Sequence, residues 1–238
     1  RAGGKPIRIA SKSVRSIDAL KYISQRVLNF AGIMAFTLDE ACYLADSGFD
    51  NILLGYPSLQ QQMLAEVAER IKRGKMITLM VDLEEHLEVI AHVGKQLDCC
   101  FPVCIDVDVS TKFPGVYFGV YRSAVKTESE FRDILEMIVQ SEYLQPVGFM
   151  GYEAQIAGVA DNLKGKGTVN KIVKSLKKKS IPKIADIRSN FAIIYTDVTG
   201  EAPLILNAGG TGSIESSIEE NHVNEITVGS GFFQPALF

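Results

Sequence analysis

Lys12 is the residue whose type and position best suit covalent chemistry. It ends a short apolar run, Ile7-Arg8-Ile9-Ala10-Ser11-Lys12, which predicts the first strand of an α/β domain, and the polar stretch Ser13–Ser16 then opens a helix. A lysine at the carboxyl end of a barrel strand points to the place where such folds keep their chemistry. A desolvated lysine there can lose its proton and form a Schiff base.

Two glycine-rich segments, Gly209–Ser213 and Gly229–Gly231, each follow an apolar strand late in the chain. A phosphate dianion can approach a backbone without Cβ atoms closely, and the hydroxyls of Thr211, Ser213 and Ser230 would add donors. Loops after the last two strands are the usual phosphate position of a barrel. An amine together with such a cradle favours pyridoxal 5′-phosphate (PLP). The alternatives are two tight turns, or a phosphate ligand other than PLP.

Three further side chains are candidates around this cofactor. Arg122 follows the acidic strand that holds Asp106 and Asp108, and would stabilise a phenolate oxygen of the cofactor. Alternatively, Arg122 is a surface arginine or the ion-pair partner of one of these aspartates. We interpret the two aspartates as structural rather than as a metal site. Tyr152 ends the sixth strand, where it would contact the cofactor ring or be a core tyrosine.

The elements that position these residues follow an alternating pattern of β-branched runs and amphipathic stretches. The predicted strands are Pro6–Lys12, Ile33–Thr37, Asn51–Tyr56, Met76–Val81, Phe101–Asp108, Val147–Tyr152, Leu204–Ala208 and Glu225–Val228. The predicted helices are Ser16–Phe30, Leu38–Ser47, Ser58–Arg73, Leu83–Leu97, Glu128–Ser141, Val169–Tyr195 and Ile214–Glu220. Thr127 and Glu130 match a capping box, and Gly32, Gly48 and Gly74 lie where helices are expected to end.

Strands that alternate with helices imply a parallel sheet covered on both faces. Eight such units predict a closed (β/α)8 TIM barrel that spans residues 1–238 as one domain. A doubly wound open sheet is the alternative, but no glycine fingerprint for a dinucleotide follows the first strand.

Composition narrows the class of protein. The chain has 238 residues, 47% of them apolar, and a net charge of −3, which leaves no basic footprint for nucleic acid. No apolar run reaches the roughly 18 residues of a membrane span, and no signal peptide is visible. The four cysteines lack zinc-type spacing, so reduced core thiols in a cytoplasmic protein are expected. The three histidines are scattered, and no metal constellation is predicted.

The two ends of the sequence suggest a domain from a longer protein. The chain begins at Arg1 without a methionine and ends on the apolar segment Gln234–Phe238, which has no helix stop or polar tail.

An ordered set of segments resembles the fold type III PLP-dependent enzymes, which share the alanine racemase barrel. The segments that show this resemblance are Arg8–Lys12, Thr37–Ala41, Leu44–Gly48, Asn51–Pro57, Ile105–Asp108, Gly151–Glu153, Asn207–Gly212 and Glu225–Ser230. The likeness is greatest to the branch of D-threonine aldolase and D-serine dehydratase. It implies that Lys12 forms the Schiff base and moves the α-proton. It also implies a set of cofactor-binding residues: Arg122, Tyr152, Gly210, Thr211, Gly212, Thr227, Gly229 and Ser230.

Two departures from the family pattern stand out. Racemases carry an arginine two residues before the glycine that matches Gly229, whereas this chain has Thr227, a neutral partner for the pyridine nitrogen. The branch tends to have a histidine three residues after the tyrosine, whereas this chain has Gln155.

The resemblance implies a PLP-dependent lyase that acts on D-configured β-hydroxy amino acids, with a racemase as the alternative. It also implies a homodimer, and a second, β-rich domain that is missing from this chain. That domain supplies a tyrosine in racemases, or histidine and cysteine ligands for a divalent metal in the lyase branch. A third alternative, from another class, is a non-catalytic PLP-binding protein of cofactor homeostasis, although its Gly-Glu-Asn-Tyr segment is not found.

Overall fold

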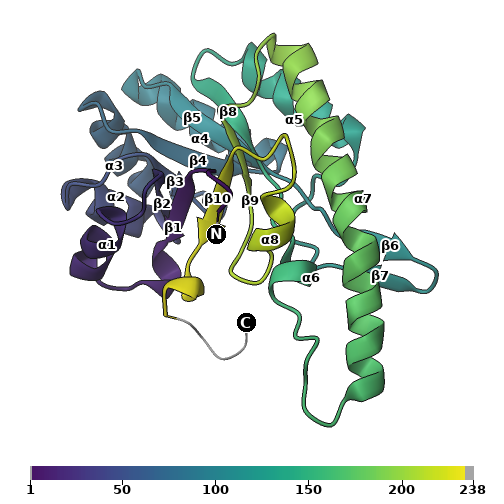
Figure 1. The fold of residues 1–238 in the computed structure, drawn as a ribbon. Coiled ribbons are helices and arrows are strands. Elements are labelled where there is room, and N and C mark those ends of the chain that lie inside the picture. Colours follow the sequence, from purple (N-terminus) through teal and green to yellow (C-terminus); the bar gives the residue numbers. More distant parts are fainter. Residues whose placement is uncertain (1, 234–238) are drawn as a thin grey trace.

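A computed structural model of the chain describes residues 2–233, so Arg1 and the apolar ending 234–238 lie outside the described residues. Eight parallel strands form a closed barrel in the order β1-β10-β9-β8-β5-β4-β3-β2, and the longer helices lie outside it (Figure 1). The barrel strands are β1 (Ile7–Ala10), β2 (Phe30–Ala35), β3 (Ile52–Leu54), β4 (Ile77–Val81), β5 (Phe101–Asp106), β8 (Leu144–Met150), β9 (Ile205–Ala208) and β10 (Glu225–Val228). The predicted (β/α)8 barrel is therefore confirmed, and the open sheet is wrong.

The helices alternate with these strands. They are α1 (Ile17–Ser24), α2 (Leu38–Asp46), α3 (Gln61–Lys72), α4 (Glu84–Leu97), α5 (Glu128–Gln140), α6 (Ala154–Ala157), α7 (Gly167–Thr199) and α8 (Ile214–Ser217). Two short 3-10 helices are η1 (Ser11–Ser13) and η2 (Ser230–Phe233), and a hairpin of β6 (Thr111–Phe113) and β7 (Val116–Phe118) follows β5. The predicted capping box of α5 is confirmed, with Thr127 and Glu130 each accepting a backbone N–H.

The first helix is shorter than predicted, and its prediction as Ser16–Phe30 is wrong. It ends at Ser24, and Phe30 already begins β2, because the Ile7 N–H bonds to the Asn29 carbonyl and starts the pairing of β1 with β2. Leu28, an apolar residue within the predicted helix, is fully exposed. The apolar residues at three- and four-residue spacing continue beyond the end of the helix, so the predicted helix is too long.

Gly32 does not end a helix, as predicted, but lies within β2 with a φ of 139°. A Cβ there would lie 2.0 Å from the Asn51 carbonyl oxygen and 3.0 Å from Nη1 of Arg8. Glycine is required at this position because the Asn51 carbonyl lies too close for any side chain, and because φ is positive.

Two kinds of core fill the fold. An apolar cluster between strands and helices includes Phe131, Phe149 and Phe191, whose rings pack at centroid distances of 4.7 to 6.1 Å. Inside the barrel, a smaller cluster holds Leu53, Met80, Cys104, Val147, Met150 and Ile205. Polar groups join this inner layer, and the largest is Arg8, which is 0% exposed. The rigid ring of strands therefore carries a charged interior beneath its carboxyl-end mouth.

Candidate functional site

A cavity of about 110 Å³ opens at the carboxyl ends of the barrel strands. Eight of the nine predicted site residues line it: Lys12, Arg122, Tyr152, Gly210, Thr211, Thr227, Gly229 and Ser230. Gly212 belongs to the same loop as Gly210 but does not line the cavity. The structure thus brings the amine from the start of the chain to the two glycine-rich loops from its end.

Lys12 lies in η1, two residues beyond β1, and its side chain is exposed. The desolvated setting that the sequence analysis expected for this amine is therefore not found. Its Nζ lies 3.4 Å from the hydroxyl of Tyr56, which follows β3. The ammonium thus faces another polar group rather than an apolar wall.

The two glycine-rich loops are joined to each other by hydroxyl groups. Thr211 Oγ1 lies 2.9 Å from Ser230 Oγ and accepts the Gly231 N–H at 2.8 Å. A Cβ on Gly229 would lie 2.7 Å from Ser13 Oγ, and a Cβ on Gly210 would lie 3.0 Å from Cε2 of Tyr152. Both glycines are therefore required by close packing against Ser13 and Tyr152, and they lie beside a concentration of hydroxyl groups. A phosphate group fits this donor set.

Thr227, in place of the arginine of racemases, ends a chain of buried hydrogen bonds inside the barrel. Asn207 donates from Nδ2 to Thr227 Oγ1 at 2.7 Å and to Glu225 Oε1 at 2.8 Å. Glu225 is held in turn by the guanidinium of Arg8. The Thr227 hydroxyl donates in return to Oδ1 of Asn207 at 3.1 Å, so its proton is held within this network at the cavity wall.

Arg122 reaches the cavity from the loop after β7. Its Nε lies 2.8 Å from Oδ2 of Asp106, at the end of β5, and its Nη2 donates to the Gly55 carbonyl. Burial raises the pKa of Asp106 to about 7, although the adjacent guanidinium acts in the opposite direction. Asp108 instead accepts hydrogen bonds from Ser110 and from the Tyr117 hydroxyl. The two aspartates therefore serve different partners, and Asp106 is the one that orients Arg122.

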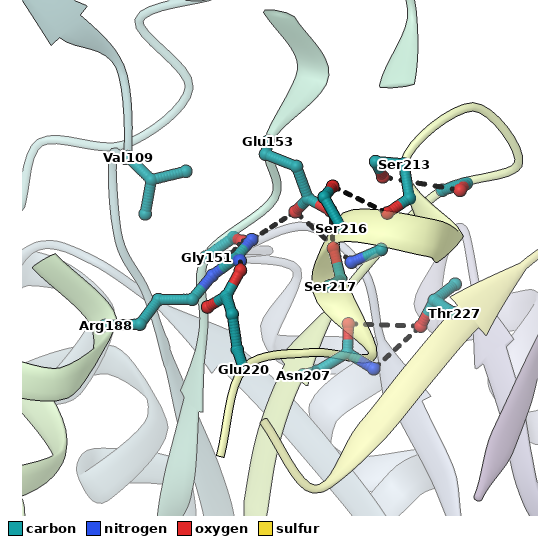
Figure 2. A network of polar contacts seen from close by, with 12 residues as sticks. Val109, Gly151, Glu153, Arg188, Asn207, Ser213, Ser216, Ser217, Glu220 and Thr227 are labelled. Carbon is teal, nitrogen blue, oxygen red and sulfur yellow. Dashed lines mark hydrogen bonds and ion pairs between the residues drawn. The ribbon is translucent and has the colours of Figure 1, made fainter. Parts of the chain in front are cut away.

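A second ionic network supports the loop after β8 from outside the barrel (Figure 2). Arg188 of α7 is 0% exposed and lies between the carboxylates of Glu153 and Glu220. Glu153 also accepts the Ser217 hydroxyl and the Gly209 N–H. Arg188 therefore ties α7 to the residue after Tyr152 and, through Glu153, to the first glycine-rich loop.

Gln155, which stands where the family branch has a histidine, is buried and donates to the Val109 carbonyl at 2.8 Å. It does not line the cavity. Its amide therefore holds neighbouring loops together.

Sequence reasoning did not single out Tyr56, Phe36 or Asn207 as site residues, although all three line the cavity. Tyr56 and Asn207 lie within segments that carry the family resemblance. The available signal was their position just after or near the end of a barrel strand, where side chains reach the mouth.

Within residues 2–233, no group of three or more histidine, cysteine, aspartate or glutamate side chains is arranged to hold a metal ion. In the same part of the chain, no helix combines the length and apolar character needed to cross a membrane.

Comparison with known proteins identifies a family. A family model described as "Alanine racemase, N-terminal domain" matches residues 2–234. A comparison with curated protein sequences finds no match.

Several solved structures share the fold. D-threonine aldolase from Filomicrobium marinum is similar with a TM-score of 0.77 and 16% identity, over 97% of this chain and 56% of that one. D-threo-3-hydroxyaspartate dehydratase from Delftia sp. HT23 is similar with a TM-score of 0.71 and 17% identity, over 96% of this chain and 54% of that one. Alanine racemase from Clostridium difficile 630 is similar with a TM-score of 0.66 and 16% identity, over 94% of this chain and 50% of that one. The chain spans about half the length of these proteins, and the likeness at this identity concerns the fold.

Proposed function

Because this chain belongs to the alanine racemase N-terminal domain family, the barrel family of fold type III PLP-dependent enzymes, we propose that it binds PLP and acts as a lyase on D-configured β-hydroxy amino acids. The observation that carries the proposal is the meeting of Lys12 with both glycine-rich loops around one cavity. When bound, PLP supplies an aldehyde for covalent attachment and an electron-withdrawing ring.

Each part of the cavity suits one part of this cofactor. Lys12 is the amine for the covalent link. Thr211 and Ser230, on the same loops as Gly210 and Gly229, suit the phosphate because they place two hydroxyl groups side by side at the cavity wall. Arg122 suits the phenolic oxygen, since its guanidinium is a fixed cation at the cavity wall.

The remaining two residues suit the ring. The Tyr152 hydroxyl and ring edge border the Gly210 loop, and its ring centroid lies 5.9 Å from Cζ of Arg122. Thr227 places a neutral hydroxyl at the cavity wall, which suits an unprotonated pyridine nitrogen if its proton turns from Oδ1 of Asn207 into the cavity.

Thr227 also bears on the choice between lyase and racemase. The racemase arginine places a positive charge at this position, whereas this chain has a neutral hydroxyl in a network that already contains Arg8 and Glu225. The two lyase structures also give higher TM-scores than the alanine racemase. These observations favour the lyase as the first candidate and keep the racemase second. A homodimer and a divalent metal bound outside the described residues belong to the same proposal.

The first test is covalent. The protein is incubated with PLP, reduced with borohydride and mapped by peptide mass spectrometry. We expect the phosphopyridoxyl group on Lys12 and its loss in Lys12→Ala, while Lys178→Ala, which removes an exposed lysine of α7, labels like the wild type. Unchanged labelling in Lys12→Ala would contradict the proposed role of Lys12.

The second test is chemical. The protein with PLP and a divalent metal is supplied with D-threonine, and glycine release is measured. Glycine supports the lyase; inversion of D-alanine to its L form supports the racemase instead. A stable visible band with no product from any of these amino acids favours a PLP carrier of cofactor homeostasis.

A further inference from the structure

Tyr56 lies beside the amine of Lys12 at the edge of the cavity. Its hydroxyl is 3.4 Å from Lys12 Nζ, while Nζ is 5.8 Å from the centroid of the tyrosine ring. The amine is thus closer to the hydroxyl than to the ring centre. The edge of the Phe36 ring packs against Tyr56 at a centroid distance of 5.2 Å. Tyr56 is therefore held by its ring and presents its oxygen to the amine.

The charges around Tyr56 favour its ionised form. Burial alone would raise the pKa of its phenol, but the Arg122 guanidinium and the Lys12 ammonium outweigh burial, so the pKa of Tyr56 lies below its usual value. Cζ of Arg122 lies 4.6 Å from the ring centroid. Tyr152 is a third titratable neighbour, and Asp106 holds Arg122 in place from β5.

The exposure of Lys12 creates a need that Tyr56 can meet. A nucleophilic lysine must shed a proton, and burial in an apolar pocket, the common way to achieve this, is absent around Lys12 in the structure. A neighbouring base within hydrogen-bond reach is the other way. Among the described residues, Tyr56 is the side chain whose hydrogen bond to Lys12 Nζ the structure records.

We propose that Tyr56 is the acid–base partner of Lys12, a role that rests on the proposed function of Lys12 as the nucleophile. The Tyr56 phenolate oxygen takes a proton from the Lys12 ammonium, so that one N–H bond breaks, one O–H bond forms, and a neutral amine and a neutral phenol result. The reverse transfer restores the ammonium when Lys12 is released. No oxidant, reductant or other reactant is needed.

The test compares Tyr56→Phe with Tyr22→Phe. Tyr22 is a matched control because an arginine, Arg26, also lies over its ring, at 3.6 Å, on the exposed surface of α1. Both substitutions keep the aromatic ring, and far-UV circular dichroism checks the fold. The cofactor-free protein is treated with formaldehyde and cyanoborohydride at several pH values, and methylation of Lys12 is followed by peptide mass spectrometry.

We expect Tyr56→Phe to slow methylation of Lys12 by about 100-fold, the lower end of the range for a positioned general base. Tyr22→Phe leaves the rate unchanged. Ultraviolet titration of the phenolates gives a second readout: one tyrosine of low pKa disappears in Tyr56→Phe, and titrates at higher pH in Lys12→Ala because the ammonium is gone.

Methylation of Lys12 in Tyr56→Phe at the wild-type rate, or survival of the low-pKa tyrosine in that variant, would overturn the role of Tyr56. Borohydride labelling of the wild type with PLP separates this failure from that of the proposed function. Labelled Lys12 with no Tyr56 effect leaves the function intact and removes Tyr56. Unlabelled Lys12 removes the PLP function, and the methylation rates still decide whether Tyr56 exchanges a proton with Lys12.

Discussion

The guanidinium of Arg8 and the carboxylate of Glu225 form a two-point contact inside the barrel, with Nε–Oε1 at 2.7 Å and Nη2–Oε2 at 2.8 Å. The same guanidinium donates to the Asn51 carbonyl, so it links β1, β10 and the start of β3. Arg8 is fully buried and Glu225 nearly so. A pair of this kind matters most when one partner is removed, because the other is then left charged and unpaired.

We therefore expect Arg8→Met to lower the free energy of unfolding by about 3–5 kcal/mol, measured by urea denaturation. The double variant Arg8→Met/Glu225→Met recovers part of this loss, since no lone carboxylate remains. A loss below about 1 kcal/mol in the single variant would mean that the pair does not stabilise the barrel.

Thr227→Val tests the Thr227 hydroxyl at the cavity wall. The substitution keeps the shape of the side chain and removes the donor, so we expect PLP affinity to fall about tenfold, which corresponds to roughly 1.4 kcal/mol for one hydrogen bond. Equilibrium titration of the visible band measures it. Thr196→Val on α7, whose hydroxyl bonds to the Ala192 carbonyl, is the control and leaves the affinity unchanged. Equal affinities for the two variants would rule out a contact between Thr227 and the cofactor.

Gly229→Ala tests whether the loop of Gly229 holds the phosphate. The added methyl lies 2.7 Å from Ser13 Oγ and pushes into the loop. We expect PLP to bind at least about tenfold more weakly, since about 1.4 kcal/mol of phosphate contacts is lost, while pyridoxal, which lacks the phosphate, binds as before. Gly167→Ala, where a Cβ meets nothing within 4 Å, is the control. An equal loss for pyridoxal and PLP would place the phosphate elsewhere.

Asp106 predicts a pH dependence of stability. Its folded-state pKa is raised from 3.8 to about 7, so the folded chain keeps a proton that the unfolded chain releases across this interval. The free energy of unfolding contributed by Asp106 is full below the lower value and falls as the pH rises toward the upper one. In Asp106→Asn this part of the slope is lost. Urea denaturation at a series of pH values compares the two proteins, and identical slopes would contradict the raised pKa.

The barrel was predictable because its strands are visible in the sequence as short apolar runs separated by glycines and polar loops. The ends of the strands were predicted less accurately. In the structure β2 begins at Phe30 rather than Ile33, and β5 ends at Asp106 rather than Asp108. These boundaries depend on pairing with neighbouring strands, which a local pattern does not contain.

The site was predictable where chemistry depends on residue type, as for Lys12 and the glycine-rich loops. It was not predictable where it depends on distant partners. Nothing near Arg8 in the sequence indicates Glu225, which lies 217 residues away. The partner of Lys12, Tyr56, comes from a different strand end, and only closure of the ring brings its hydroxyl within reach.

The pairing of β1 with β10 is the seam where the first and last barrel strands meet, with Ile7 beside Ile226 and Ile9 beside Val228. Lys12 stands on one side of this seam and Ser230 on the other, both on the wall of one cavity. A molecule bound to both residues links the two strands, and it can bind in this way only when the barrel is closed. Its binding energy is then added to the stability of the barrel by mass action, so that occupancy of the site and resistance to unfolding rise together.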